Sequence, residues 1–388
     1  MMFHVCITPG FFIWVNRIQS QYTTHRTMSN ATKDLPQTDL DLRCKVVAWL
    51  KTMRIQTALV STLPLWLGFL SVSSLSIYDI AVLGVIGVTY HIFGFTLNEV
   101  MDKDHDASIG NDSVHPIARG EVNQQKAKIL SVIALGVSIA ISAISMYSVS
   151  ATILLAVSSI PAYTYNKYSK CHWWSNFYLS TWIFMMVLVG SLYAGSPTTM
   201  TLALGIAVSI QIFIQVVEGD LKDLTGTEKS ICRRLGVKLV SNVEYLKKNT
   251  PLNYDTDNMQ ISEHYIVAYT KRFVGLVYSL KFLEITLFMW VAYSMWAFSG
   301  YYTLVYAIAF YSLVIVFITS LSMFMVYVYD RDSIKKYSSM HELSFVAIAG
   351  LTAIASDPRT GLIVGLAPIM WFLVTNKIIH SGSLNPDI

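Results

Sequence analysis

Long apolar blocks, separated by short polar connections, make up most of this chain. Most of the blocks are long enough to cross about 30 Å of hydrocarbon as a helix. Backbone N–H and C=O groups inside lipid must pair within their own segment, so each block is expected to be a helix rather than a strand. The expected spans are 55–74, 78–97, 128–147, 149–165, 176–195, 198–217, 274–297, 301–328, 343–356 and 360–378.

The fold class that follows is all-α: a polytopic transmembrane helical bundle of nine or ten spans. The count stays open because 343–356 is short for a span and Asp357-Pro358-Arg359 separates it from the next block. The composition agrees, since 54% of the residues are hydrophobic and 13% are charged, with a mean hydropathy of +0.49. A soluble domain carries about 25% charged residues. The chain therefore has too little polar surface for a water-soluble body of its size.

The domain organisation is read from the segments outside these blocks. Residues 1–39 are expected to be a disordered tail or a mis-annotated extension before Met28, with an organellar transit peptide as a further interpretation. Residues 40–53 have apolar positions at helical spacing and predict an amphipathic helix at the membrane surface. Residues 54–380 form the membrane domain, and 237–272 are expected to be a cytoplasmic insertion that makes a hairpin or a cap.

Basic residues predict the topology. The connections 75–77, 146–150, 196–199 and 298–302 contain no Lys or Arg, whereas the alternate connections contain almost all of them. By the positive-inside rule, the basic connections and the N-terminus are cytoplasmic. The expected location is therefore an integral, multi-pass membrane protein, in the cell membrane if the source is prokaryotic.

Two acid-rich motifs end even-numbered spans on this same side. Asn98, Asp102 and Asp106 follow the second span at spacings of four residues, so they form one stripe if the helix continues. Asp220 and Asp223 end the sixth span at a spacing of three. Each motif alone fits a solvated helix end. Together they suit a diphosphate bridged by Mg²⁺, because this ion takes a few carboxylates and completes its shell with water and phosphate oxygens.

The order and spacing of the two motifs resemble the UbiA superfamily of intramembrane prenyltransferases. The segments that follow, His115-Pro-Ile-Ala-Arg119-Gly-Glu-Val-Asn and the run from Glu228 to Lys238, resemble the family's continuation of each motif. The resemblance covers roughly residues 45–345. Two departures stand out: His115-Pro116 replaces an Arg-Pro pair, and Thr227 occupies the third acidic position of the second motif.

The resemblance implies roles for individual residues. Mg²⁺ and the diphosphate would be bound by Asn98, Asp102, Asp106, Asp220 and Asp223, with the four aspartates as the catalytic carboxylates. The phosphates would be gripped by basic residues, and the candidates are Arg54, Lys103, Arg119, Lys222, Lys229 and Arg233. Each basic residue is alternatively a topological charge near lipid headgroups.

Three further features have two interpretations each. Aromatic residues around the third cytoplasmic loop, with Tyr163 as the substrate-binding candidate, either stabilise a carbocation or form an interfacial belt. Lys281 and Glu284, within an apolar block, either pair with each other or line the acceptor side of the site. His91 is either a hydrogen-bonded interior histidine or a proton acceptor.

The leading hypothesis is Mg²⁺-dependent transfer of a prenyl group from a polyprenyl diphosphate to a lipophilic acceptor, with release of pyrophosphate. The acceptors that the resemblance implies are an aromatic quinone precursor and a glycerol-phosphate lipid. A terpene cyclase of the same superfamily is the alternative enzyme, and a transporter with acidic gates is the alternative outside enzymes. Membrane lipids are the other expected partners, no nucleic acid is expected, and the oligomeric state stays open.

Overall fold

The computed structural model describes residues 37–108, 115–145, 148–169, 172–222, 224, 230–241, 265–299 and 331–379. Residues 1–47 and 48–388 are two separate units, and everything below concerns the second. The expectations for residues 1–36 and for the span 301–328 lie outside the described residues. Helix α2, Gln37–Thr52, covers all but the last residue of the predicted amphipathic segment 40–53.

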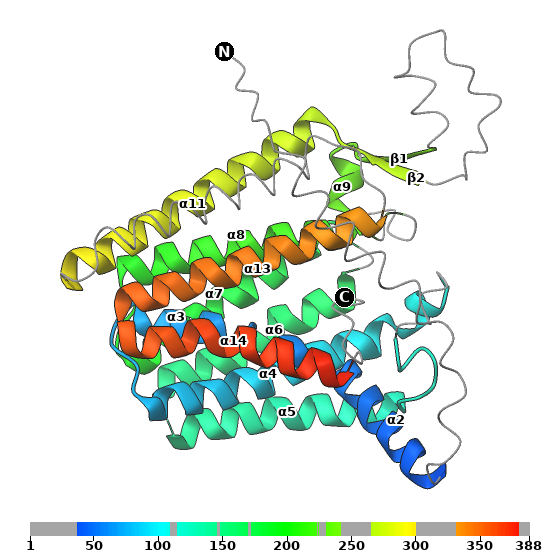
Figure 1. Ribbon diagram of the computed structural model, residues 1–388, viewed down its shortest axis with the longest axis horizontal. Coiled ribbons are helices and arrows are strands. Elements are labelled where there is room, and N and C mark those ends of the chain that lie inside the picture. Colours follow the sequence, from blue (N-terminus) through cyan, green and yellow to red (C-terminus); the bar gives the residue numbers. More distant parts are fainter. Residues whose placement is uncertain are drawn as a thin grey trace. The chain divides into compact units, whose positions relative to one another are not determined.

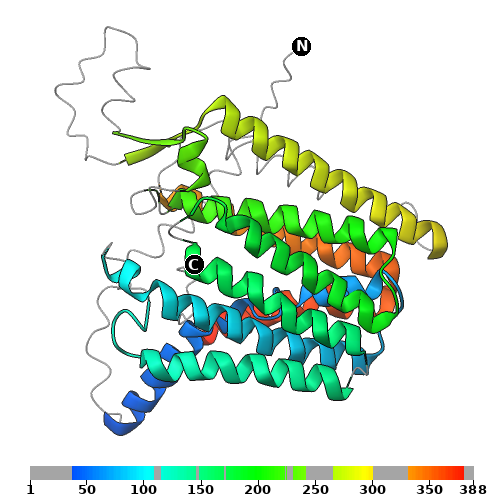
Figure 2. The same ribbon diagram turned by 180° about the vertical axis from the view of Figure 1, so that it is seen from behind.

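Helices make up nearly all of the described chain. They are η1 (Ile55–Thr57), α3 (Leu63–Leu70), α4 (Ile77–Ser108), α5 (Gln124–Ser145), α6 (Val149–Tyr168), α7 (Ser175–Ala194), α8 (Thr199–Lys222), α9 (Ile231–Arg234), α11 (Lys271–Ser299), α13 (Arg331–Ser356) and α14 (Pro358–Ile379). The long helices run side by side in both Figure 1 and Figure 2. Two short strands, β1 (Lys238–Ser241) and β2 (Tyr265–Ala268), pair antiparallel within the predicted insertion, so the helical fold carries one small ladder.

Six helices of the described part are long and apolar enough to cross a membrane. They are the helices that cover Ile77–Ala107, Gln124–Ser145, Ser175–Ala194, Thr199–Leu221, Lys271–Ser294 and Pro358–Ile379. Their outward side chains are apolar, as at Ile133, Phe282 and Met370, which are each more than half exposed. The chain is therefore an integral membrane protein, and the total of nine or ten spans stays a prediction.

The first predicted span, 55–74, is not one continuous helix. A single 3₁₀ turn, η1, is followed by turns, and only eight residues, Leu63–Leu70, are α-helical. Pro64 lies in the first turn of α3, where its missing N–H is not needed, and its ring would clash with the carbonyl of Val60 if the helix extended backwards. Arg54, just before η1, has a left-handed backbone with φ 45°.

Of the last two predicted spans, 360–378 matches α14 and 343–356 differs from expectation. Helix α13 begins at Arg331, well before the predicted 343–356, and its apolar part is Phe345–Ser356. The break at Asp357 lies where the sequence predicted it, with Pro358 at the first position of α14. Gly350 and Gly365 let the two helices approach closely, because a Cβ added to Gly350 would lie 2.9 Å from the Gly365 Cα.

The core lies where α3 crosses α7. Leu65, Trp66 and Val187 are buried there, in one cluster with side chains of α4, α8, α11 and α13. Gly68 and Gly190 permit the crossing: a Cβ on Gly68 would be 2.0 Å from the Val187 carbonyl oxygen, and a Cβ on Gly190 would be 2.0 Å from that of Leu65. The short first helix is thus held by backbone contact with α7.

Gly190→Ala is expected to destabilise the protein by about 1–3 kcal/mol, because the new methyl group collides with backbone that cannot rotate away. Gly136→Ala on α5 is the matched control, since nothing lies within 4 Å of the added Cβ. Thermal unfolding in detergent measures both. Equal unfolding midpoints for the two variants would contradict the close α3–α7 crossing.

Candidate active site

The first acid motif lies on an unbroken helix. Because α4 continues to Ser108, Asn98, Asp102 and Asp106 share one helical stripe. Asn98 Nδ2 donates a hydrogen bond to Asp102 Oδ2 at 2.8 Å. Asp102 is half-buried and Asp106 is buried. The amide of Asn98 therefore orients the neighbouring carboxylate of the motif.

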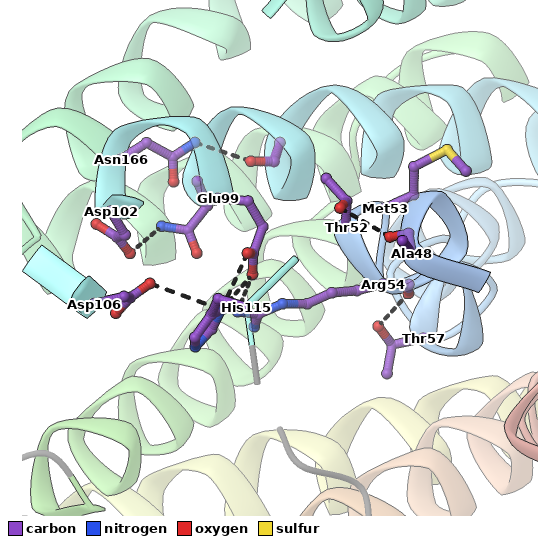
Figure 3. A network of polar contacts seen from close by, with 12 residues as sticks. Ala48, Thr52, Met53, Arg54, Thr57, Glu99, Asp102, Asp106, His115 and Asn166 are labelled. Atoms are coloured by element: carbon purple, nitrogen blue, oxygen red, sulfur yellow. Dashed lines mark hydrogen bonds and ion pairs between the residues drawn. The ribbon is translucent and has the colours of Figure 1, made fainter. Parts of the chain in front are cut away.

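Glu99, beside the stripe, joins three separate parts of the chain. Its carboxylate is buried. It accepts hydrogen bonds from Arg54 Nη2 at 3.0 Å and from His115 Nδ1 at 3.0 Å. His115 Nδ1 also lies 3.7 Å from Asp106 Oδ2. Figure 3 shows Arg54 and His115 approaching Glu99 from different elements, with Asp102 and Asp106 beside them. This network places two cations at the acid-rich end of α4.

Glu99 favours the charged form of both side chains. Burial disfavours charged His115, but the hydrogen bond and charge of Glu99 outweigh this effect and raise the pKa of His115 above its ordinary value. Burial likewise opposes the charge of Arg54, yet the Glu99 carboxylate holds the pKa of Arg54 above its usual range. His115, which replaces the arginine of the related motif, is therefore a positive charge whenever it is protonated.

The backbone of Arg54 is in a left-handed conformation, with φ 45° and ψ 43°. A side chain other than glycine in this region costs on the order of 1–3 kcal/mol and persists only where its surroundings enforce it. Several contacts do so here. The Thr57 hydroxyl donates to the Arg54 carbonyl at 3.1 Å, and Trp371 Nε1 of α14 donates to the Ile55 carbonyl at 2.6 Å.

His91 is the third anchor of this turn. Its Nε2 lies 3.1 Å from the Met53 carbonyl and 3.0 Å from the Arg54 carbonyl, and its Nδ1 lies 2.8 Å from the Ser61 hydroxyl. Since carbonyls only accept, Nε2 carries the proton and Nδ1 accepts from Ser61. Both ring nitrogens are engaged, which matches the interpretation of His91 as a hydrogen-bonded interior histidine.

The second acid motif ends α8, and only part of it is described. Asp220 Oδ2 accepts a hydrogen bond from Asn176 Nδ2 of α7 at 3.1 Å. Asp223 and Lys229 lie outside the described residues, as does the side chain of Lys222. Cys232 of α9 packs close by: burial, reinforced by the charge of Asp220, raises the pKa of its thiol.

The fold brings the two motifs together. Helices α4 and α8 end at the same end of the bundle, on the right in Figure 1 and on the left in Figure 2. The phenol of Tyr165, half-buried on α6, lies within electrostatic range of both Asp102 and Asp220. The positive charge of Arg54 interacts electrostatically with Asp102 and with the same phenol. Asp102, Asp220 and Arg54 are thus all within electrostatic range of the same phenol.

This arrangement suits a metal that shares its ligands with a substrate. Among the described residues, no three His, Cys, Asp or Glu side chains are grouped closely enough to enclose a metal ion by themselves. Mg²⁺ does not need such a cage, because it is commonly held by one or two carboxylates with phosphate and water oxygens. Asp102 and Asp220 with their amide partners are a donor set of this kind.

The described contacts of the other predicted site residues lie elsewhere. Lys103 Nζ donates to Gln124 at 3.3 Å, and Arg119 pairs with Glu121 at 2.8 Å on the surface. Arg233 donates to the Leu224 carbonyl, and Tyr163 is 45% exposed on the outer side of α6. Arg54, in contrast, bonds to Glu99 beside the first acid motif.

Sequence reasoning missed two residues of this site. Glu99 was hidden as a neighbour of Asn98, although an acid this close to an apolar block needs a cation partner. Asn176 could have been found only as a polar position at the end of a span facing the same side. Tyr165 is one of the aromatic residues expected around the third cytoplasmic loop, although Tyr163 was the candidate chosen from them. His115 was noted as a departure, but its pairing with Glu99 was not expected.

Comparisons with known proteins agree with this architecture. A solved structure of digeranylgeranylglyceryl phosphate synthase is 17% identical with a TM-score of 0.53, over 80% of this chain and 98% of that one. The apo structure of a UbiA homologue from Aeropyrum pernix K1 is 15% identical with a TM-score of 0.57, over 81% and 99%. Comparison with curated proteins finds no match. These likenesses define the fold class, a helical membrane bundle.

The family assignment follows from the sequence profile. The profile of the UbiA prenyltransferase family matches residues 55–241, which include both acid motifs and every helix from α3 to α9. Together with the fold, this match supports the UbiA superfamily.

A second buried charged cluster lies among α8, α11 and α13. Lys281 Nζ donates to Glu284 Oε2 and to Gln211 Oε1, each at 2.5 Å, and His341 Nδ1 lies 2.7 Å from Glu218 Oε1. All five side chains are buried. Of the two interpretations of Lys281 and Glu284, the contacts match a structural ion pair inside the membrane.

Lys281→Met is expected to destabilise the protein by about 3–5 kcal/mol, because it leaves the Glu284 carboxylate buried without its cation. The double variant Lys281→Met/Glu284→Leu should recover most of this loss, since it removes both charges together. Thermal unfolding in detergent compares the two. A double variant no more stable than the single one would show that the pair is not the cause.

Proposed function

We propose that the chain transfers a prenyl group from a polyprenyl diphosphate to a lipophilic acceptor and releases pyrophosphate. The observation that carries the proposal is that α4 and α8 end at the same end of the bundle, with Asp102, Asp220 and Arg54 all within electrostatic range of Tyr165. The match to a family of prenyltransferases supports the same reaction class. An aromatic quinone precursor and a glycerol-phosphate lipid are the acceptors we consider.

The acid motifs would hold the metal and, through it, the diphosphate. The ligands that we assign are Asn98, Asp102, Asp106, Asp220 and Asp223. Bound Mg²⁺ would neutralise the charge that develops on the leaving pyrophosphate. Arg54 and His115 add positive charge on the α4 side, held in place by Glu99. Lys103, Arg119, Lys222, Lys229 and Arg233 remain candidates for further phosphate contacts.

The reaction breaks the bond between the allylic carbon and the diphosphate oxygen. The carbon then bonds to the acceptor, which loses a proton. Deeper along α4, the ring of Phe95 lies under the Arg54 guanidinium at 5.4 Å and 4.2 Å from the ring of His91. Apolar and aromatic surroundings of this kind exclude water, which would otherwise capture the carbocation. Tyr165 is the aromatic side chain that we place nearest the reacting carbon.

The membrane orientation is part of the proposal. The positive-inside pattern places the acid motifs and the N-terminus on the cytoplasmic side. A water-soluble diphosphate head would then enter from the cytoplasm, while the prenyl tail stays among the helices.

Asp102→Asn and Asp220→Asn are each expected to lower prenyl-diphosphate turnover about 100-fold or more, because each removes a charge that balances the metal and leaving group. The assay supplies geranyl, farnesyl or geranylgeranyl diphosphate with and without Mg²⁺, and measures pyrophosphate release and lipid products. Asp79→Asn is the matched control, since Asp79 lies at the opposite end of the same helix and caps its first turn.

The products separate the competing functions. A prenylated acceptor supports the transferase, whereas pyrophosphate release with a terpene hydrocarbon or alcohol as the only product supports a cyclase. Turnover of both Asp variants at the rate of the Asp79→Asn control would show that the assigned site is wrong. No Mg²⁺-dependent pyrophosphate release from any of the three diphosphates, with a lipid extract as acceptor, would contradict the enzyme itself.

A further inference from the structure

Three carboxylates and two cations share the acid-rich end of α4. Glu99, Asp102 and Asp106 lie within two turns of one helix, and Arg54 and His115 face them from other segments. The charges are therefore close enough for either cation to change partner. His115 Nδ1 is 3.0 Å from Glu99 and 3.7 Å from Asp106, and Arg54 acts on Asp102 as well as on Glu99.

The Glu99 side chain is more deeply buried than the two side chains that pair with it. Its side chain is 3% exposed, whereas those of Arg54 and His115 are 25% and 17% exposed. A carboxylate that already accepts hydrogen bonds from two separate side chains, Arg54 and His115, has little room left for a hydrated metal. Its position fits a counter-charge for the cations better than a ligand for Mg²⁺.

The backbone of Arg54 is held in place, so Arg54 cannot reach a different carboxylate by moving its main chain. His91, Thr57 and Trp371 hold the turn around it through hydrogen bonds at 2.6–3.1 Å. Only the side chain is then free to swing between neighbouring carboxylates. Which acid it faces depends on the negative charge of Glu99.

We propose that Glu99 is a positioning residue that keeps Arg54 and His115 away from the metal-binding carboxylates Asp102 and Asp106. The inference rests on the proposed function, because it assumes that these two aspartates bind Mg²⁺. Without the charge of Glu99, both cations turn to Asp102 and Asp106, and they then compete with the metal for the same oxygens. The cations also lose the orientation in which they meet a diphosphate.

The decisive variant is Glu99→Gln, which keeps the size and the acceptor oxygen but removes the charge. Mn²⁺, a spectroscopic substitute for Mg²⁺, is titrated into the purified full-length protein and followed by electron paramagnetic resonance. We expect the Mn²⁺ dissociation constant to rise about tenfold or more. In the turnover assay, the Mg²⁺ concentration for half-maximal activity should rise in parallel.

The double variant Glu99→Gln/Arg54→Gln distinguishes positioning from other roles. If Arg54 occupies the metal ligands once Glu99 is neutral, removing Arg54 should restore most of the Mn²⁺ affinity, while the KM for the prenyl diphosphate stays high. If Glu99 binds the metal itself, or if its loss only loosens the fold, the second substitution restores nothing. Mn²⁺ affinity that does not recover therefore overturns the proposal.

Glu284→Gln is the matched control, because Glu284 is also a buried carboxylate paired with a cation and lies on α11. It is expected to lower the unfolding midpoint but to leave the Mn²⁺ affinity within about twofold of wild type. Glu99→Gln with wild-type Mn²⁺ affinity would refute the inference alone if wild type still turns over prenyl diphosphate. A wild-type protein that binds Mn²⁺ but releases no pyrophosphate would refute the proposed function instead.

A conservative substitution provides a second check. His115→Arg keeps a positive charge between Glu99 and Asp106, so turnover and Mn²⁺ affinity should stay within about threefold of wild type. His115→Ala should raise the KM for the prenyl diphosphate at least about tenfold, with a smaller change in kcat. Equal effects of the two variants would show that His115 acts by shape rather than by charge, against the proposal.

Discussion

Charges at the end of a membrane helix must balance over a few ångströms, because lipid and protein screen them far less than water does. In this chain the balance at the end of α4 is set by Glu99, which is buried and bonded to both Arg54 and His115. Without that pairing, Arg54 and His115, which are both partly buried, would face only the acids of the motif. The geometry of Asn98, Asp102 and Asp106 is therefore inseparable from the residue beside them.

The same requirement explains why the acid-rich end is built from distant parts of the chain. Arg54 lies 45 residues before Glu99, and Asn176 lies 44 residues before Asp220. Glu99 and Asp220 thus each receive a donor from another segment. The chemistry proposed for the site depends on α4 and α8 for its acids, and on η1, α7 and the segment after α4 for the groups that orient them.

Local patterns predicted much of this structure. Apolar block length located most of the long helices, and the four-residue spacing of Asn98, Asp102 and Asp106 predicted a stripe that the continuous α4 provides. The broken first span was not predicted, because hydropathy does not register Pro64 or the left-handed Arg54. Nor could spacing tell Arg54 from Lys103 or Arg119, since the partner of a long basic side chain is decided by packing across the bundle.

The hydrogen bond from Trp371 to the Ile55 carbonyl joins the last described helix to the first turn of the membrane domain. It has a consequence for biogenesis. During synthesis, the segment around Ile55 emerges about 300 residues before Trp371, so the turn that carries Arg54 lacks one of its anchors until α14 has been made. The polypeptide therefore acquires this arrangement of charges only after α14 has inserted.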